Sequence, residues 1–125
     1  MGKTIEILPE TADSVLCLRF SGIITAEDFI NEHEKPLLQI IEKYGHYSMY
    51  IDYSPAFIKW SPEAADLSFK CITACGPKVR RCAYVNPPQE RLLMMKLLNP
   101  ITTNADVRYF NNGEQQIALD WIRGP

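Results

Sequence analysis

The four cysteines are the side chains of this sequence with the widest chemical range. Cys71 and Cys75 are four positions apart in a predicted helix, so they share one face, and two thiolates could supply half of a structural zinc site. Cys17 and Cys82 stand in predicted strands and could complete that site only if the helix packed over them. Their apolar surroundings favour small buried hydrophobic side chains instead, and the dipole of a helix opposes a thiolate in its C-terminal half. We therefore expect four reduced, buried thiols and neither a metal site nor a cofactor.

The histidines and serines form no catalytic constellation in the sequence. His33 falls beside the apolar stripe of a predicted helix and could act as a general base only with a carboxylate and a cleft nearby, so we expect a packed side chain. His46 follows Gly45 in a turn, and we expect it to be solvated. No Gly-x-Ser-x-Gly nucleophile elbow occurs, and the six glycines are not clustered into a phosphate-binding loop. These features predict a protein that is not an enzyme.

Composition narrows the class of protein further. The chain has 125 residues, of which 46% are apolar and 22% charged, and this fits one globular domain spanning residues 1–125. The net charge is -2, and the densest basic run, Lys78 with Arg80 and Arg81, is expected to be a solvated loop, so nucleic acid is not an expected partner. No apolar run approaches the ~20 residues of a membrane span, and the N-terminus has no signal-peptide core. We expect a soluble cytoplasmic protein.

The N-terminal half predicts a hairpin followed by a long helix. Residues 4–8 and 15–20 are extended runs joined by a turn-like stretch, which favours an antiparallel pair. The helix begins at Thr25, whose side chain can cap it, and ends at Gly45. Pro36 lies inside this helical pattern, and we expect it to kink the helix or to split it.

The C-terminal half predicts strands that alternate with helices. The strands cover residues 47–52, 80–85 and 106–110. A first helix runs from the cap Ser61 and Pro62 to about Cys75, a second follows Pro88 to about Leu98, and a third is capped by Asn112. The predicted order is ββαβαβαβα, an α/β fold with a mostly parallel sheet, an antiparallel N-terminal edge strand and helices packed on the sheet.

Six segments occur in an order shared with a known family. They are Ile5-Glu6-Ile7-Leu8-Pro9, Ser21-Gly22-Ile23-Ile24-Thr25-Ala26-Glu27-Asp28, Met49-Tyr50-Ile51-Asp52, Phe57, Trp60-Ser61-Pro62 and Asp106-Val107-Arg108-Tyr109-Phe110. Together they resemble the SpoIIAA-like proteins, which are relatives of the STAS domains that act as anti-sigma factor antagonists. The resemblance implies a right-handed βα superhelix, a topology also similar to that of CRAL-TRIO lipid carriers.

STAS domains of the best-known type switch partners when a serine after the middle strand is phosphorylated, in an Asp-Ser-Ser-Gly type motif. Here Asp52 is followed by Tyr53-Ser54-Pro55, and the next helix begins only at Ser61. By its position Ser61 is the possible phosphoacceptor, although a serine before a proline is also what a helix start prefers.

The most informative apolar feature lies where the loops at the carboxyl ends of the strands should gather, which is where ligands of open α/β sheets bind. The stretch after the middle strand carries Tyr53, Phe57, Ile58 and Trp60, which is unusually apolar for a solvated loop. The helix at residues 92–98 is apolar on nearly every side, so one sheet face cannot bury all of it. Together with the loop residues, the helix residues Met94, Met95 and Leu98 are the candidate binding residues.

These residues could be core under a closed lid, a homodimer interface, or a groove for a partner or a small apolar ligand. The leading hypothesis is a non-enzymatic STAS-like protein-interaction or regulatory module, expected to be a homodimer. The alternative is a carrier or sensor that holds a small hydrophobic or lipid-like ligand between the Phe57–Trp60 loop and the Leu92–Leu98 helix. A weaker third hypothesis is an enzyme built on His33 or the cysteines.

Overall fold

The computed structural model describes residues 3–89, 92–93, 95–97 and 105–124. Its elements in chain order are β1 (Ile5–Ile7), β2 (Val15–Ile24), α1 (Ala26–Phe29), the π-helical turn η1 (Ile30–Glu34), α2 (Lys35–Tyr44), β3 (Tyr47–Trp60), α3 (Pro62–Cys75), the 3-10 turn η2 (Gly76–Lys78), β4 (Val79–Val85), β5 (Asp106–Phe110) and α5 (Gln115–Arg123). Residues 89, 92–93 and 95–97 are also helical. No helix in these described ranges is long and apolar enough to cross a membrane.

The sheet has five strands in the order β1-β2-β3-β4-β5. β1 runs antiparallel to β2, and the other neighbours are parallel. The predicted α/β class, the mostly parallel sheet and the antiparallel N-terminal edge are therefore confirmed. Because each strand lies beside the strand that precedes it in the chain, the parallel part of this sheet has no point where the strand order reverses.

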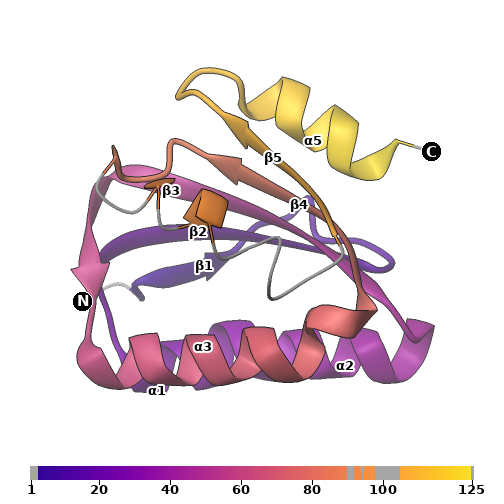
Figure 1. The fold of residues 1–125 in the computed structure, drawn as a ribbon, viewed down its shortest axis with the longest axis horizontal. Helices are drawn as coiled ribbons and strands as arrows, with labels where there is room; N and C mark the ends of the chain where they lie inside the picture. Colours follow the sequence, from indigo (N-terminus) through magenta and orange to yellow (C-terminus); the bar gives the residue numbers. More distant parts are fainter. Residues whose placement is uncertain (1–2, 90–91, 94, 98–104, 125) are drawn as a thin grey trace.

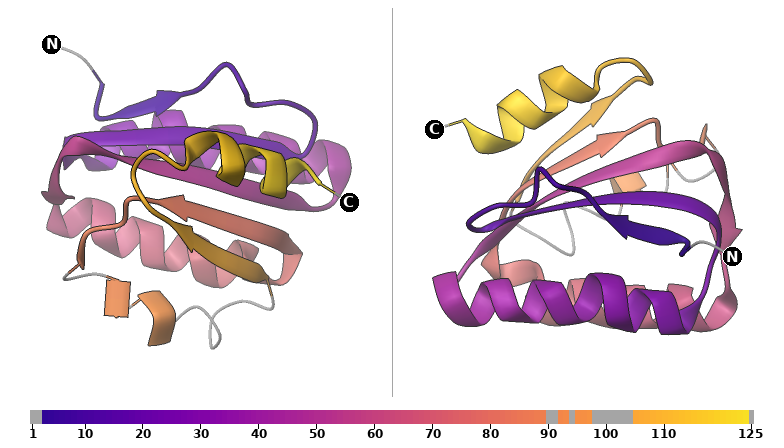
Figure 2. Two further views of the ribbon diagram at one scale, coloured as in Figure 1. Left: turned by 90° about the horizontal axis from the view of Figure 1, so that it is seen from above. Right: turned by 180° about the vertical axis from the view of Figure 1, so that it is seen from behind.

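Helices cover the two faces of the sheet unequally (Figures 1 and 2). Crossovers between parallel strands are right-handed, and here each one leads to the next strand in the same direction across the sheet. The connecting helices therefore lie on one face, and α1, α2 and α3 form this layer. α5 comes after the last strand and lies alone on the opposite face. The larger core is between the sheet and the helical layer, and a smaller core, including Cys17, Tyr50 and Ala83, is under α5.

The predicted long helix continues through Pro36 without splitting. Thr25 caps it as expected, since its side chain accepts a hydrogen bond from the Asp28 backbone, and Gly45 ends it in the left-handed conformation. Upstream of Pro36 the chain widens into the π-helical turn η1, in which the Lys35 backbone N–H bonds the Ile30 carbonyl. A proline lacks a donor and crowds the preceding turn, and a π-helical turn relieves both problems inside a continuous helix.

The stretch predicted as a loop after residue 52 is instead the second half of β3. It pairs with β2, which runs to Ile24 rather than ending at Phe20, and the register ends at the pair Ile24 and Trp60. Gly22 has a φ of +65° at a register shift between these strands, a conformation that suits glycine. The prediction of a loop was wrong because it ended the two strands at residues 20 and 52, before their paired extensions.

The last helix also begins later than predicted. Its N-cap is Glu114, not Asn112. The Glu114 side chain turns back and accepts a hydrogen bond of 2.7 Å from the Asn111 backbone N–H. This bond holds the turn that precedes the helix. At the other end, the Arg81 guanidinium donates to the carbonyls of Trp121 and Gly124, so a side chain from β4 holds α5 in place.

Candidate functional site

An aromatic cluster fills the space between the carboxyl end of β2 and β3 and the start of the helical layer. Its members are Phe20, Phe29, His33, Tyr53, Phe57 and Trp60. Phe20 lies at its centre, with ring centroids 5.3 Å from Tyr53 and 5.2 Å from Trp60, both edge-on. Edge-to-face pairs at these distances are a favourable arrangement of aromatic rings. The large side chains of this region therefore pack mainly against one another.

The predicted binding residues fall into three groups in the structure. Tyr53 is buried, and Phe57 and Trp60 are partly buried against the main core. Ile58 is 63% exposed, and Met95 is partly exposed. Met94 and Leu98 lie outside the described residues. Of the β3 residues, only Ile58 thus presents a large apolar side chain freely to solvent.

The helical residues after Pro88 carry two strongly exposed apolar side chains. Leu93 is 68% exposed and Leu97 is 60% exposed, and their spacing of four places them on one helix face. Lys96 lies 5.5 Å from the centre of the Tyr109 ring on β5. On α3, Phe69 is 56% exposed and Ile72 is 37% exposed. We call Phe69, Ile72, Leu93 and Leu97 the helical apolar face.

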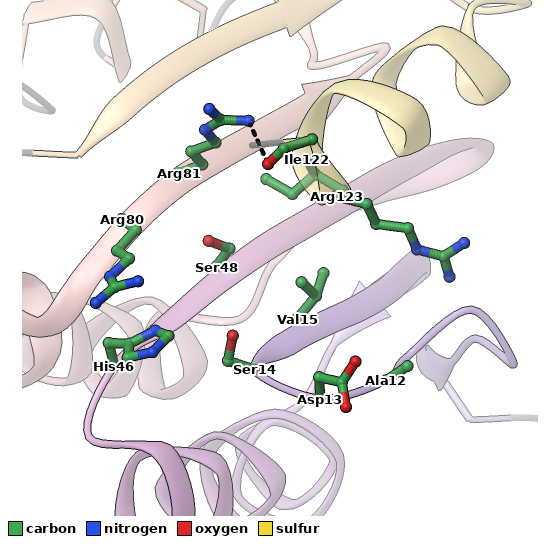
Figure 3. Close-up of a pocket in the computed structure, with 11 residues that line it drawn as sticks. Ala12, Asp13, Ser14, Val15, His46, Ser48, Arg80, Arg81, Ile122 and Arg123 are labelled. Atoms are coloured by element: carbon green, nitrogen blue, oxygen red, sulfur yellow. Dashed lines mark hydrogen bonds between the residues drawn. The ribbon is translucent and has the colours of Figure 1, made fainter.

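A polar pocket of about 510 Å³ opens at the other end of the sheet, beside the start of the strands (Figure 3). Its lining comes from the segment that enters β2, from the start of β3, from β4 and from the end of α5: Ala12, Asp13, Ser14, Val15, His46, Ser48, Arg80, Arg81, Ile122, Arg123 and Gly124. Sequence reasoning took His46 and the arginines as solvated and did not bring them together. The signal was available, since residues next to the starts of neighbouring parallel strands must meet at one edge.

Comparison with known proteins settles the family. Residues 15–123 match the SpoIIAA-like family. The chain belongs to the SpoIIAA-like family. A crystal structure of an uncharacterized protein of the DUF3478 family with a SpoIIAA-like fold, from Shewanella loihica PV-4, is 24% identical over 94% of this chain and 93% of that chain, with a TM-score of 0.68. At this identity the likeness concerns the fold. No curated protein matches the chain.

Ser61 in this SpoIIAA-like domain caps α3. Its side chain accepts a hydrogen bond of 3.1 Å from the Ala64 backbone, and its own backbone N–H donates to the Ile24 carbonyl. Pro62 follows at the first turn of the helix. The structural role expected from the sequence is thus present, and the role of Ser61 as a phosphoacceptor stays a prediction.

His33 is buried within the π-helical turn of the domain. Its ring stacks on Phe29 with centroids 4.5 Å apart, and its Nδ1 has no hydrogen-bond partner among the described residues. Burial lowers the pKa of His33 from 6.5 to about 4, because a charged imidazole cannot be solvated there. The expected packed side chain is confirmed, and a general base at this position would have no access to a substrate.

The four cysteines are all buried and unpaired by disulfides, as the sequence predicted. Burial raises the pKa of Cys17 to about 11 and that of both Cys71 and Cys82 to about 12, so these thiols stay protonated and unreactive at neutral pH. Within the described ranges no group of three or more His, Cys, Asp or Glu side chains could hold a metal ion.

Asp52 is a buried carboxylate on the α5 face of the sheet, 7% exposed. Burial raises its pKa, and the opposing influences are the Arg19 charge on the paired β2 position and a hydrogen bond from the Gln115 side chain. Gln115 is the first residue of α5, so its influence on this carboxylate places Asp52 near the start of that helix.

Proposed function

We propose that this SpoIIAA-like domain is a non-enzymatic STAS-type interaction module and that its partner is a second copy of the chain. The observation that carries the proposal is the helical apolar face, on which Leu93, Leu97 and Phe69 each expose more than half of their surface. A large apolar side chain gains about 1.5–3 kcal/mol when it is fully buried. Several such side chains on neighbouring helices are typical of a protein-binding surface.

The two helical segments are expected on the same face of the sheet. α3 and the helical residues 92–93 and 95–97 lie in consecutive crossovers between parallel strands, and right-handed crossovers place such connections on one face. Lys96 also contacts Tyr109, which stacks on Tyr84 of the main core with centroids 5.7 Å apart. In a two-fold dimer the same patch would meet itself, and apolar helix faces are self-complementary in this way.

The binding residues expected from the sequence take two roles in this proposal. Met95 belongs to the same segment as Leu93 and Leu97 and would contribute to the contact, whereas Met94 and Leu98 lie outside the described residues and stay predicted binding residues. Ile58 is the exposed member of the β3 group and lies at the far end of that strand. Tyr53, Phe57 and Trp60 would hold the carboxyl end of β3 in place by packing inward.

The domain's other predicted properties are consistent with this role. A reducing cytoplasm suits four cysteines that form no disulfide. Phosphate on Ser61 would add negative charge at the start of α3, where the helix dipole favours it. The interaction through the helical apolar face does not depend on that modification, so the two parts of the proposal can be tested separately.

Light scattering of the purified protein tests the proposal directly. We expect a mass close to twice that of the chain at micromolar concentration. Leu97→Lys should return it to the monomer, because a buried unpaired charge is very unfavourable in an apolar contact. The matched control is Ile117→Lys on α5, since Ile117 is 59% exposed but lies on the opposite side of the sheet.

Two results would contradict this proposal. One is a wild-type protein that stays monomeric at every concentration up to about one millimolar. The other is a dimer that Leu97→Lys leaves intact or that Ile117→Lys dissociates equally well. Circular dichroism of both variants would check that the fold is kept.

A further inference from the structure

The pocket at the amino end of the sheet is lined by the hydroxyl of Ser48. Ser48 is only 7% exposed, and its backbone N–H donates to the Ser14 carbonyl at 2.8 Å. No hydrogen bond of the Ser48 hydroxyl is formed with the described residues. Figure 3 shows this hydroxyl and that of Ser14 in the space between β2 and β4. The hydroxyl oxygen is not among the fully covered polar atoms that lack a partner, so it is open to the pocket and can form a hydrogen bond with a bound molecule.

The cations around the pocket are not equally engaged. Arg81 donates to the carbonyls of Trp121 and Gly124, and Arg123 donates to the carbonyl of Glu10. Arg80 is exposed and forms no ion pair within the described part of the chain. Its guanidinium points toward the His46 ring in Figure 3. Arg80 is therefore the arginine that can bind a ligand without breaking a contact of the fold.

His46 adds a second donor next to Arg80. Its Nδ1 is fully covered and has no hydrogen-bond partner among the described residues. The other ring nitrogen is thus the one that can face the pocket. Gly45, in the left-handed conformation, ends α2 immediately before His46, and β3 begins immediately after it, so the ring is held between two ordered elements.

The charge around the pocket is opposite in sign to that of the whole chain. Three arginines line it against one carboxylate, that of Asp13, although the protein carries a net charge of -2. Asp13 lies on the β2 side in Figure 3, away from Arg80 and His46. Arg123 lies on that same side, where it donates to the Glu10 carbonyl. The unengaged arginine is thus at one side of the pocket and the carboxylate at the other, which suits a ligand with an anionic group at one side and a hydroxyl or amine at the other.

We propose that this pocket binds a small phosphate monoester that carries a hydroxyl or amine group. The phosphate would sit among Arg80, His46 and Ser48, and Asp13 would accept a hydrogen bond from the distant hydroxyl or amine. A phosphate presents three acceptor oxygens in different directions, which matches donors that come from β3, from β4 and from the turn before β3. Arginine binds such oxyanions with two parallel hydrogen bonds. A volume of about 510 Å³ is ample for a molecule of this size.

Titration calorimetry at constant ionic strength tests the site with glycerol 3-phosphate as the probe. Inorganic phosphate, glycerol and acetate are the comparison ligands. We expect saturable binding of glycerol 3-phosphate, weaker binding of inorganic phosphate, and the weakest binding of acetate and glycerol. Amide resonances of Ser14, Ser48 and Arg80 should shift on titration, because they surround the proposed phosphate position.

Two variants separate the phosphate site from general electrostatic attraction. Arg80→Ala should weaken binding about tenfold or more, because it removes a charge-assisted pair of hydrogen bonds. Ser48→Val keeps every charge, fills the floor of the pocket and should weaken binding as well. Lys70→Ala is the control, since Lys70 is an exposed cation paired with Asp66 on α3 and should leave the affinity within twofold.

The proposal would be overturned by any of three results. Glycerol 3-phosphate could show no saturable binding at millimolar concentration. Arg80→Ala and Lys70→Ala could have equal effects, which would mean screening of overall charge rather than a site. Acetate could bind as tightly as the phosphate ester, which would assign the pocket to carboxylates. None of these outcomes depends on whether the domain dimerises.

Discussion

The two ends of the β-sheet differ sharply in how they are filled. At the carboxyl end, β2 and β3 continue far beyond β4, and the aromatic cluster around Phe20 closes the space beneath them. At the amino end the strands begin nearly together, and serine, histidine and arginine side chains surround an open pocket. In open α/β sheets whose strand order reverses, ligands bind at the carboxyl ends of the strands, at the point of reversal. This sheet has no such reversal in its parallel part, and the pocket lined by His46 and Arg80 lies at the opposite edge.

The two ends are expected to differ in stability and in binding. Buried aromatic side chains at the carboxyl end should contribute much of the free energy of folding. Polar groups at the amino end should contribute little to it and should bind a ligand. Four measurements test this difference.

The first is Phe20→Ala, at the centre of the aromatic cluster. Phe20 has no exposed surface, so the change leaves a cavity, and we expect the free energy of unfolding in urea to fall by about 3–5 kcal/mol. Ile23→Ala is the control on the same strand, because Ile23 is 42% exposed and should cost far less. Equal losses in the two variants would show that the cluster does not dominate the stability of this end.

The second measurement is the pH dependence of stability. The pKa of His33 is about 4 in the folded protein and 6.5 when the ring is exposed, so the unfolded chain binds an additional proton between these values. Stability should therefore fall by about 3 kcal/mol as the pH decreases from 6.5 to 4, and this contribution should be constant below pH 4. His33→Phe should flatten the curve in that window. A variant curve parallel to that of the wild type would assign the dependence to other groups.

The third measurement concerns the cap that follows the aromatic end of β3. Ser61→Ala removes the hydrogen bond to the Ala64 backbone and should lower stability by about 1 kcal/mol. Ser61→Asp should restore most of that loss, since aspartate caps helices equally well. If alanine has no effect on thermal unfolding, the cap is dispensable and another function must account for Ser61.

The smallest effect is expected at the amino end. Arg80→Ala should change the free energy of unfolding by less than about 0.5 kcal/mol, because the exposed guanidinium forms no ion pair within the described residues. Chemical denaturation of the same sample that is used for ligand titration would measure this. A large loss of stability would mean that Arg80 supports the fold, and weaker ligand binding could then no longer be read as a lost contact.

Local sequence signals were sufficient for most of the fold. Thr25, Gly45 and the Ser61-Pro62 pair marked helix ends correctly because capping depends on a few neighbouring residues. The antiparallel edge and the parallel strands followed from the lengths of the connections. The second half of β3 was missed because its pairing depends on a distant strand, and it tolerates Pro55. β4 ends at Val85 opposite Asp52, so Pro55 lies on an edge without a β4 partner, where a missing N–H is tolerated.

The candidate sites were harder to predict than the fold. The excess of apolar side chains in the helix after Pro88 was visible in the sequence, because nearly every position there is apolar. The inward packing of Tyr53 and Trp60 was not, since it requires β2 to extend as far as Ile24. The pocket brings together His46, Arg80 and residues at the end of α5, and no local pattern links segments so far apart in the chain.

The sequential order of the strands has a consequence for how the chain acquires its structure during synthesis. Each new strand can join the edge formed by the strand before it, so the sheet can grow in the order of synthesis, although each parallel pair joins strands that a whole crossover separates in the chain. α5 is the exception, because it emerges last and must return across the sheet to cover Cys17, Tyr50 and Ala83. A nascent chain that stops before Gln115 would therefore leave this apolar surface exposed to solvent. A chaperone should bind such truncated products more strongly than the full-length protein.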